Sequence, residues 1–418
     1  MDKKIALNIS TSNFEQCLKC TICTVYCPVS AVNPDYPGPK QAGPDNERMR
    51  LKDADFYDKA LKHCLNCKRC EVACPSNVKI GDIIQAARIK YSTDRPKLRD
   101  MILANTDIVG TMASTFAPIV NTVVGMKPVK MIMDKTLAID HHRTFPKYSS
   151  QRFESWYKKQ AAEQDKFDKH VSYFHGCYVN YNFPKLGKDL VKILNAIGYG
   201  VHLLEKEKCC GVALISNGLI GQAKRQALLN TESIRKSVKE QGRTVLGTSS
   251  TCIFTLRDEY HHLLDIDNED IKDGIELATR FIFRLIDSED IKLAFRDDYK
   301  ARIAYHTPCH MEKLGWAIYS TSLMRMIPGV QLTMLDSQCC GIAGTYGFKK
   351  ENYEVSQKIG ETIFRQIETL QPDFVATDCE TCKWQIEMST SVEVQNPISI
   401  IADALDVEKT MQLNNVNL

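Results

Sequence analysis

The sequence predicts an α+β multidomain protein, with a mainly helical N-terminal domain followed by two tandem α/β domains. Eight of the 17 cysteines lie within residues 17–74, in two identical spacings. The other nine lie within residues 177–382, where the sequence repeats itself and alternates β-rich with helical stretches. We therefore divide the chain into a two-cluster domain (1–100), a linker (101–165), and two cysteine-rich domains (166–298 and 299–418).

The composition excludes some classes of function. The chain has 418 residues and a net charge of +3, and its 54 basic and 51 acidic side chains are intermixed, so no tract favours nucleic acid. The start, MDKKIALNISTSNFEQC, lacks the apolar run of a secretory signal, and we expect the protein to stay in the cytoplasm. Cysteines in a reducing compartment indicate metal or redox chemistry rather than disulfides.

Both N-terminal cysteine groups follow the pattern C-x2-C-x2-C-x3-C-P, ending at Pro28 and Pro75. This spacing is typical of ferredoxins with two [4Fe–4S] clusters. Zinc sites and redox-active CxxC pairs are the alternatives, but zinc sites usually separate their CxxC pairs by a longer loop. Two copies, each with its proline, favour an electron-carrying pair of iron–sulfur clusters, in which iron is bound through cysteine.

In such motifs the fourth cysteine ligates the other cluster. We therefore expect two sites with exchanged fourth ligands, which ties both halves of the domain together. The first ferredoxin site is Cys17, Cys20, Cys23 and Cys74; the second ferredoxin site is Cys64, Cys67, Cys70 and Cys27.

The linker contains an unusual apolar segment. Residues 81–91 predict an amphipathic helix that closes the ferredoxin domain, and residues 108–126 then run without a charge before Lys127, Lys130 and Lys135. Pro118 and Asn121 make this segment too broken and polar for a free-standing transmembrane helix. We expect a helical hairpin at a membrane surface or an arm against a partner subunit. An internal pair of core helices is the alternative.

The C-terminal half is a tandem repeat. Residues 172–182 match 303–313, and corresponding cysteines are 132 residues apart (Cys177 and Cys309) or 130 apart (Cys209 and Cys339; Cys252 and Cys382). Each copy alternates strands, expected at 171–176, 201–205, 244–247, 302–307, 330–335 and 374–378, with helices such as 184–198 and 221–241. The cysteines follow strands, and ligands of open α/β sheets gather beyond the carboxyl ends of strands. Three loops are therefore expected to converge on one site in each copy.

The C…CCG…CxxC arrangement resembles the cysteine-rich (CCG) domain of the heterodisulfide-reductase family. That resemblance implies an unusual non-cubane iron–sulfur assembly held by five thiolates. Only the second copy has all five; the first has Ser249 in place of one cysteine, so its cluster type stays open and it can be vacant. The second CCG site is Cys309, Cys339, Cys340, Cys379 and Cys382, and the first CCG site is Cys177, Cys209, Cys210 and Cys252.

Other residues flank these sites. Gly211 and Gly341 follow the paired cysteines and fit a turn that brings backbone close to a cofactor. His175, His306 and His310 lie beside ligand loops, and we expect them to be hydrogen-bond donors or surface residues rather than ligands. His63, beside Cys64, supports no assignment.

Neither G-x-G-x-x-G between a strand and a helix nor a G-x-x-x-x-G-K-[ST] motif occurs, so the sequence offers no flavin, nicotinamide or nucleotide site and no catalytic residue. The complete layout resembles the family of iron–sulfur subunits of anaerobic glycerol-3-phosphate dehydrogenases. This resemblance implies a flavoprotein subunit that oxidises sn-glycerol 3-phosphate, a second accessory subunit, and electron transfer by this chain to membrane quinone in anaerobic respiration. It also implies peripheral association with the cytoplasmic face of the inner membrane.

Three alternatives remain. The layout also resembles the iron–sulfur subunits of glycolate and lactate oxidases. The CCG sites can instead cleave a disulfide substrate, as the heterodisulfide-reductase resemblance implies, although one copy is incomplete. The chain can also serve only for docking or membrane anchoring, with vestigial clusters.

Overall fold

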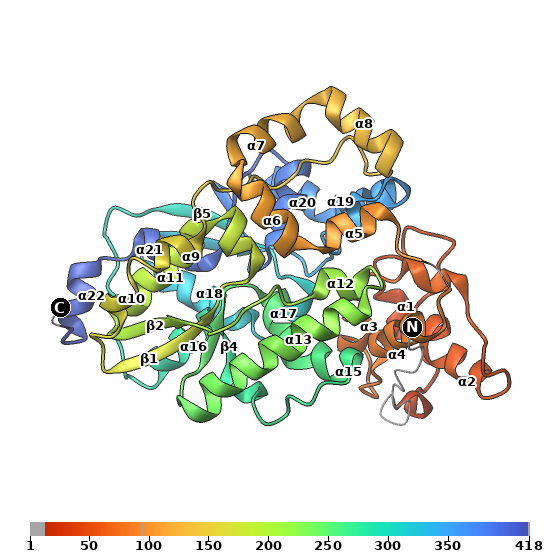
Figure 1. The fold of residues 1–418 in the computed structure, drawn as a ribbon, viewed down its shortest axis with the longest axis horizontal. Helices are drawn as coiled ribbons and strands as arrows, with labels where there is room; N and C mark the ends of the chain where they lie inside the picture. The colour runs from red at the N-terminus through yellow and green to blue at the C-terminus, as the bar shows by residue number, and fades with distance from the viewer. Residues whose placement is uncertain (1–12, 94, 417–418) are drawn as a thin grey trace.

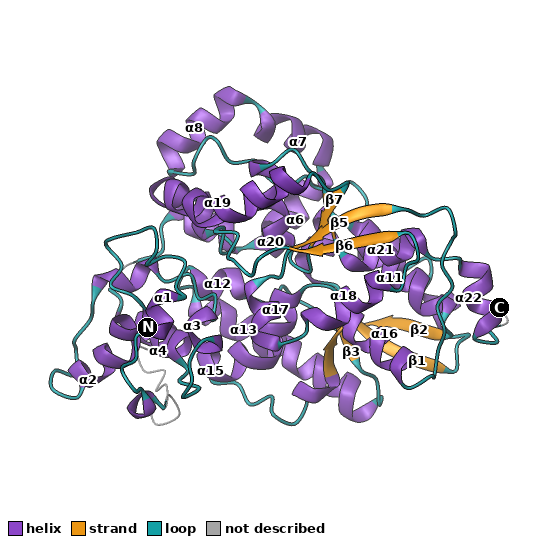
Figure 2. Ribbon diagram, turned by 180° about the vertical axis from the view of Figure 1, so that it is seen from behind, coloured by secondary structure: helices purple, strands orange, loops and turns teal. Residues whose placement is uncertain are grey.

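The computed structural model describes residues 13–93 and 95–416 (Figure 1). A helical N-terminal part, a helical arm and two halves that each contain a sheet follow one another along the chain. Figure 2 shows the two sheets from behind, with helices around both. The α+β multidomain fold and the helical N-terminal part are confirmed.

The N-terminal part is made of short helices around the cysteine motifs. Each motif loop has two residues in the left-handed conformation, Lys19 and Thr21 in the first and Asn66 and Lys68 in the second, with φ from 57° to 63°. This conformation is uncommon for side-chain-bearing residues and turns the backbone sharply, so both loops share one local geometry. The helices are α1 Ile22–Val25, α2 Asn46–Arg50, α3 Arg69–Val72 and α4 Ile80–Tyr91, with further helical turns at Phe14–Gln16, Gln41–Asp45 and Lys59–His63.

A helical arm follows, visible at the top of Figure 1. It consists of α5 Leu98–Ala104, α6 Thr106–Thr115, α7 Ala117–Gly125 and α8 Lys127–Leu137. Pro118 stands in the first turn of α7, where its missing N–H is tolerated. In the described part of the chain no single helix has the length and apolar character to cross a membrane. Helices α6 and α7 have the required length and apolar character only when they are taken as a pair, and the pair is bent by 106°.

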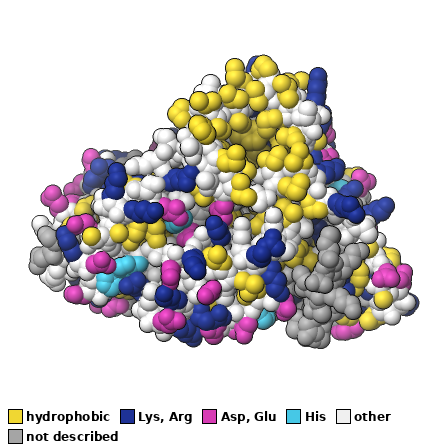
Figure 3. All heavy atoms as spheres, viewed as in Figure 1, with side chains coloured by type: hydrophobic (Ala, Val, Ile, Leu, Met, Phe, Trp, Pro, Cys, Tyr) yellow, Lys and Arg dark blue, Asp and Glu magenta, His cyan; other side chains and the backbone are white. Residues whose placement is uncertain are grey.

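The apolar side chains of the arm face outward. We define the apolar arm surface as the exposed residues Ile108, Met112, Phe116, Ile119, Val123, Met126, Met131 and Ile132. Hydrophobic side chains gather over this region in Figure 3. The buried side of α6 is narrow: Gly110 packs against Tyr181, where a Cβ would lie 2.5 Å from the ring. The alternative of an internal core helix pair is therefore wrong for most of this segment.

The first sheet-containing half has four parallel strands in the order β2-β1-β3-β4. The central strand β1 pairs with β2 and β3, so that Tyr173 lies opposite both Leu203 and Leu246. Two short helices, α9 Phe153–Tyr157 and α10 Ala161–Gln164, precede this half. Its elements are β1 Lys169–Phe174, α11 Pro184–Ala196, β2 Tyr199–Leu203, α12 Val212–Ser216, α13 Ile220–Arg235, β3 Val245–Gly247, α14 Ser250–Phe254, α15 Tyr260–Leu264, β4 Ile275–Leu277 and α16 Ala278–Asp287.

The second half repeats this topology, with parallel strands in the order β6-β5-β7-β8. Each strand of the second sheet has its counterpart at the same place in the first, which confirms the tandem repeat. Its elements are β5 Ala301–Tyr305, α17 Cys309–Leu314, α18 Ala317–Arg325, β6 Val330–Met334, α19 Tyr353–Leu370, β7 Phe374–Ala376, α20 Glu380–Ser389, β8 Val394–Gln395, α21 Pro397–Ala404 and α22 Val407–Leu413.

The two halves pack on each other reciprocally. Helix α11 of the first half packs against α21 of the second, and α18 of the second packs against α16 of the first. Since α11 and α18 hold equivalent places, as do α16 and α21, the halves are related by an approximate two-fold rotation. Buried side chains of both halves form one shared hydrophobic cluster. The packing also joins the loops after β3 and β7, where the Ser250 N–H donates to the Asp378 carbonyl at 2.9 Å.

Candidate iron–sulfur sites

The residues predicted for the first ferredoxin site lie around one cavity. Cys17, Cys20 and Cys23 from the first motif and Cys74 from the second all line it. Burial raises the pKa of Cys23, and the neighbouring Cys17, Cys74 and Cys20 raise it further. The Val78 N–H donates to the Cys74 sulfur at 3.4 Å. The structure thus places Cys74 with the three cysteines of the other motif, as the exchanged assignment requires.

The second ferredoxin site shows the reverse exchange. Burial raises the pKa of Cys27 to about 12, and Cys67 and Cys64 are the neighbouring thiolates that add to this rise. Burial and then Glu71 raise the pKa of Cys70, followed by Cys67, Cys64 and Cys27. The Gln85 amide donates to the Cys64 sulfur at 3.6 Å, and N–H donors to cluster sulfurs are one means by which proteins set cluster potentials.

The second CCG site brings together cysteines from three loops. The Cys340 and Cys382 sulfurs are 3.3 Å apart. Cys309 and then Cys340 are the main partners that lower the pKa of Cys339, and Cys382 is the main partner that lowers the pKa of Cys379 to about 5. All five predicted thiols therefore adjoin one another at the carboxyl ends of β5, β6 and β7.

The first CCG site brings its four cysteines together in the same way. The Cys209 and Cys177 sulfurs are 3.7 Å apart, and Cys209 and then Cys252 are the main partners that raise the pKa of Cys210. The Ser249 hydroxyl accepts a hydrogen bond from the Cys252 N–H at 3.3 Å and also bonds the Glu380 carboxyl. Ser249 thus caps helix α14 and has protein partners of its own.

The glycines after both cysteine pairs adopt left-handed backbone, with φ of +87° at Gly211 and +88° at Gly341. A Cβ at Gly341 would lie 2.0 Å from the Ser356 carbonyl oxygen. The Gly341 N–H donates to the Cys339 sulfur at 3.4 Å. Both glycines thus form the expected left-handed turn, and at Gly341 the backbone also packs too closely for a side chain.

The second ferredoxin site adjoins the second CCG site. Cys339 and then Cys67 raise the pKa of Cys309, so a thiol of each site faces the other. Arg69, which follows Cys67 by two residues, donates to the Glu312 carboxylate at 2.7 Å and to the Ser337 carbonyl at 2.7 Å. Burial alone would lower the pKa of Arg69, but Cys309, Glu312 and Cys67 raise it, so the guanidinium between the two sites stays charged.

The two CCG sites also adjoin each other. The Thr251 hydroxyl of the first half lies 3.5 Å from the Cys379 sulfur of the second. Glu380 is half-buried beside both sites, and desolvation, followed by Cys379, raises the pKa of its carboxyl to about 8. The four cysteine groups therefore form one continuous series: first ferredoxin site, second ferredoxin site, second CCG site, first CCG site.

The histidines near these sites have different surroundings. His175 bonds the Gly176 carbonyl at 2.9 Å, and His310 stacks on Phe254 and bonds the Asn66 carbonyl at 3.2 Å. His306 is fully buried, and burial lowers its pKa to about 4. His63 lies 3.3 Å from the Asn33 amide. Of the two expectations, hydrogen-bond donor or surface residue, burial leaves only the first for His175 and His306.

Sequence reasoning missed three contacts to these sites. The Asp107 carboxylate of the arm accepts a hydrogen bond from the Cys209 N–H at 2.9 Å, and burial, followed by Cys209, raises its pKa to about 6. Arg69 and Thr251 are the other two. Asp107 is 102 residues from Cys209 along the chain, and no local pattern indicates such a contact.

The donor sets fit iron–sulfur clusters. Each group offers four or five cysteine sulfurs, and thiolates are the ligands that hold such clusters. Residues 13–78 match the family described as 4Fe-4S dicluster domain, and residues 171–257 and 303–387 each match the family described as Cysteine-rich domain. The protein thus binds iron–sulfur clusters.

Relatives extend this match to nearly the whole chain. The chain is 59% identical over 397 residues to the C subunit of anaerobic glycerol-3-phosphate dehydrogenase from Escherichia coli strain K12, a match that covers 95% of this chain and 100% of the relative. The same values hold for the protein of that name in Escherichia coli O157:H7. "Lactate utilization protein A" of Oceanobacillus iheyensis is 28% identical over 200 residues, which is 45% of this chain and 76% of that relative. The chain belongs to the family of the C subunits of anaerobic glycerol-3-phosphate dehydrogenase.

Proposed function

We propose that this chain is the electron-transfer subunit of an anaerobic sn-glycerol-3-phosphate dehydrogenase. In this proposal a flavoprotein subunit oxidises the substrate, an accessory subunit joins the assembly, and this chain delivers electrons to membrane quinone in anaerobic respiration. When bound, the clusters supply one-electron carriers. The ligands are proposed to be the cysteines of the four sites, with two [4Fe–4S] clusters in the ferredoxin sites and a non-cubane assembly at the five-cysteine site.

The continuous series of cysteine sites is the observation that carries this proposal. Cys67 faces Cys309, and Thr251 touches Cys379, so side chains of neighbouring sites are in contact at these two boundaries. Electron transfer between fixed carriers needs such proximity and little rearrangement. A chain used only for docking has no need for four adjoining thiol sites.

The ends of the series support a direction of electron flow. Cys20, in the first ferredoxin site, is exposed, which favours entry of electrons there from a partner subunit. The first CCG site lies against the arm, because Asp107 of α6 bonds the Cys209 backbone. We therefore propose that electrons leave from the first CCG site, at the end of the protein that carries the apolar arm surface.

The apolar arm surface supports peripheral attachment to the cytoplasmic face of the inner membrane. Phe116 and Ile119 are 61% and 65% exposed, and Lys127 and Lys130 follow on α8. Apolar side chains with nearby lysines are typical of segments that lie in the interface of an anionic bilayer. Attachment there would bring the first CCG site close to a quinone that stays in the lipid.

The experiment is reduction of the purified complex by its substrate under anaerobic conditions. We expect sn-glycerol 3-phosphate to produce the EPR signals of reduced iron–sulfur clusters in this chain, and only when the flavoprotein subunit is present. Lactate and glycolate serve as controls for the alternative oxidase assignment. Reduction by lactate or glycolate and none by sn-glycerol 3-phosphate would contradict the proposed substrate.

A further inference from the structure

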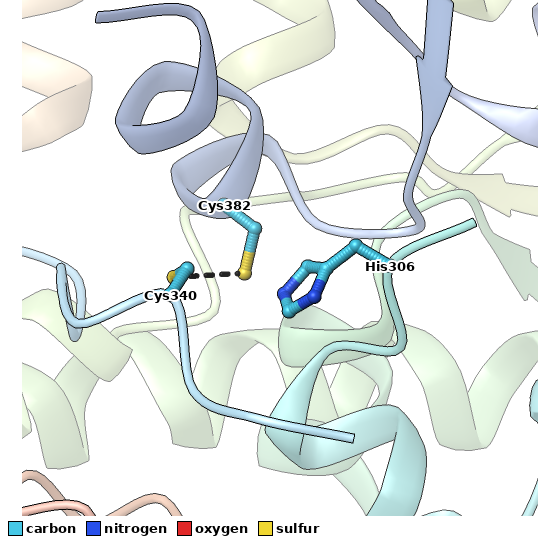
Figure 4. Close-up of side chains that lie close together, drawn as sticks. All are labelled: His306, Cys340 and Cys382. Carbon is cyan, nitrogen blue, oxygen red and sulfur yellow. Dashed lines mark hydrogen bonds between the residues drawn. The ribbon is translucent and has the colours of Figure 1, made fainter. Parts of the chain in front are cut away.

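His306 occupies an unusual position at the second CCG site. It follows β5, and its backbone N–H donates to the Ala376 carbonyl of β7 at 2.9 Å. The ring is 0% exposed, and neither ring nitrogen has a hydrogen-bond partner among the described residues. A ring nitrogen and the sulfurs of Cys340 and Cys382 all lie within 4.8 Å of one another. Figure 4 shows the imidazole beside these two thiols.

An unpartnered imidazole is costly in a protein interior. Leaving a buried donor or acceptor unsatisfied destabilises the folded state, and folded proteins rarely contain such groups without a reason. A neutral imidazole carries one N–H whichever nitrogen holds the hydrogen. The sulfurs at the second CCG site are the groups beside the ring that can accept that hydrogen.

The equivalent histidine of the first half is satisfied differently. His175 interacts with the Glu207 carboxylate at 3.2 Å and the Glu154 carboxylate at 3.5 Å, and it bonds the Gly176 carbonyl. Its ring nitrogens therefore have oxygen partners and no need of a sulfur. The two CCG sites thus differ in their histidine as well as in Ser249.

We propose that His306 donates a hydrogen bond from its ring N–H to a sulfur of the iron–sulfur group at the second CCG site, and thereby raises the reduction potential of that group. A donor to a cluster sulfur stabilises the more negative, reduced state, and hydrogen bonds to the sulfurs are among the factors that set such potentials. The inference rests on the proposed binding of a cluster by this site, and it does not depend on the physiological donor or acceptor.

The test is an EPR-monitored redox titration of the full chain, with iron analysis of each sample. In His306→Ala we expect the signal of the second CCG site to persist at a lower midpoint potential. At the wild-type midpoint, the ratio of reduced to oxidised group should fall about three- to tenfold, the equivalent of one neutral hydrogen bond. His306→Gln, whose amide retains an N–H, should recover part of the loss. His202→Ala, which changes a histidine on β2 away from the cysteines, should leave the midpoint unchanged.

A second measurement uses the unaltered protein and so does not depend on the folding of a variant. With ¹⁵N-labelled histidine, pulsed EPR of the second-site signal should show one weak nitrogen coupling, as a hydrogen bond to sulfur produces. A strong coupling would indicate direct iron ligation, and either that result or no coupling at all would overturn the donor role. An unchanged midpoint in His306→Ala, or wild-type protein without a cluster at the second CCG site, would overturn it too. Failure of the proposed function looks different: the midpoint shifts as expected, but sn-glycerol 3-phosphate and the flavoprotein do not reduce the signal.

Discussion

The Arg69 guanidinium donates to the Glu312 carboxylate at 2.7 Å, and this contact joins helix α3 of the ferredoxin part to helix α17 of the second half. Lys313 and Glu71 form a second ion pair across the same boundary at 2.8 Å. These contacts fix the loop of Cys67 against the loop of Cys309. Rigid placement of the two sites follows from side chains that are not themselves ligands.

Arg69→Gln should therefore weaken this boundary. The substitution leaves Glu312 without its charged partner, and we expect a loss of about 1–3 kcal/mol in the free energy of unfolding, since most of the contact is buried. Electron passage between the second ferredoxin site and the second CCG site should slow, as seen by freeze-quench EPR. The matched control is Arg365→Gln, which removes an exposed pair with Glu361 and should change stability by less than about 1 kcal/mol. Equal stability and equal electron passage in both variants would contradict a clamping role.

The exchanged ligands make a prediction of their own. Cys20 and Cys67 are each the second cysteine of their motif, and the exchange concerns only the fourth. Cys20→Ala and Cys67→Ala therefore serve as references for loss of the first and second [4Fe–4S] signals. We expect Cys74→Ser to give the EPR spectrum of Cys20→Ala, and Cys27→Ser to give that of Cys67→Ala, because each fourth cysteine lies in the other motif's site. The opposite pairing of spectra would show that each motif holds its own cluster.

Much of this architecture is predictable from local pattern. Helix α4 and six of the eight strands within the described residues lie where hydrophobic period and β-branched content place them, since those signals arise within single elements. Strands β4 (Ile275–Leu277) and β8 (Val394–Gln395) were missed because three or two residues carry no readable alternation.

The cysteine groupings were accessible as well, because each ligand motif has a fixed spacing. The neighbours that link one site to the next were not. Arg69 is 243 residues from Glu312, and Thr251 is 128 residues from Cys379. Such contacts depend on how whole domains dock, and a single sequence carries no local signal for them.

Ser249 distinguishes the two CCG sites. Ser249→Cys restores the five-cysteine pattern of the second copy, and we expect the EPR spectrum of the first CCG site to become similar to that of the second. The hydroxyl caps α14 by accepting from the Cys252 N–H, so loss of the cap should cost about 1 kcal/mol. Ser249→Ala removes the same cap without adding a thiol and controls for that cost. If the first site keeps its wild-type spectrum in Ser249→Cys, the missing cysteine does not determine its cluster type.

The apolar arm surface predicts membrane binding that charge can abolish. Met112→Glu with Ile119→Glu places two carboxylates on side chains that are 67% and 65% exposed, so the fold should tolerate them. Each removes on the order of 2 kcal/mol of apolar burial in a bilayer, so the binding constant for anionic vesicles, measured by co-flotation, should fall by a factor on the order of 1000. Leu228→Glu with Ile318→Glu alters two similarly exposed apolar residues elsewhere and should float as the wild type does. Undiminished flotation of the arm variant would contradict membrane binding and would indicate that this surface contacts a protein partner.

This chain is proposed to connect substrate oxidation to membrane quinone through its cysteine sites. The most direct measurement compares wild type and Cys67→Ala in the complex assembled with its flavoprotein and accessory subunits on quinone-containing vesicles. With sn-glycerol 3-phosphate, both complexes should reduce a soluble dye that accepts electrons from the flavoprotein, but only the wild type should reduce the quinone. Quinone reduction by Cys67→Ala at the wild-type rate would contradict the account.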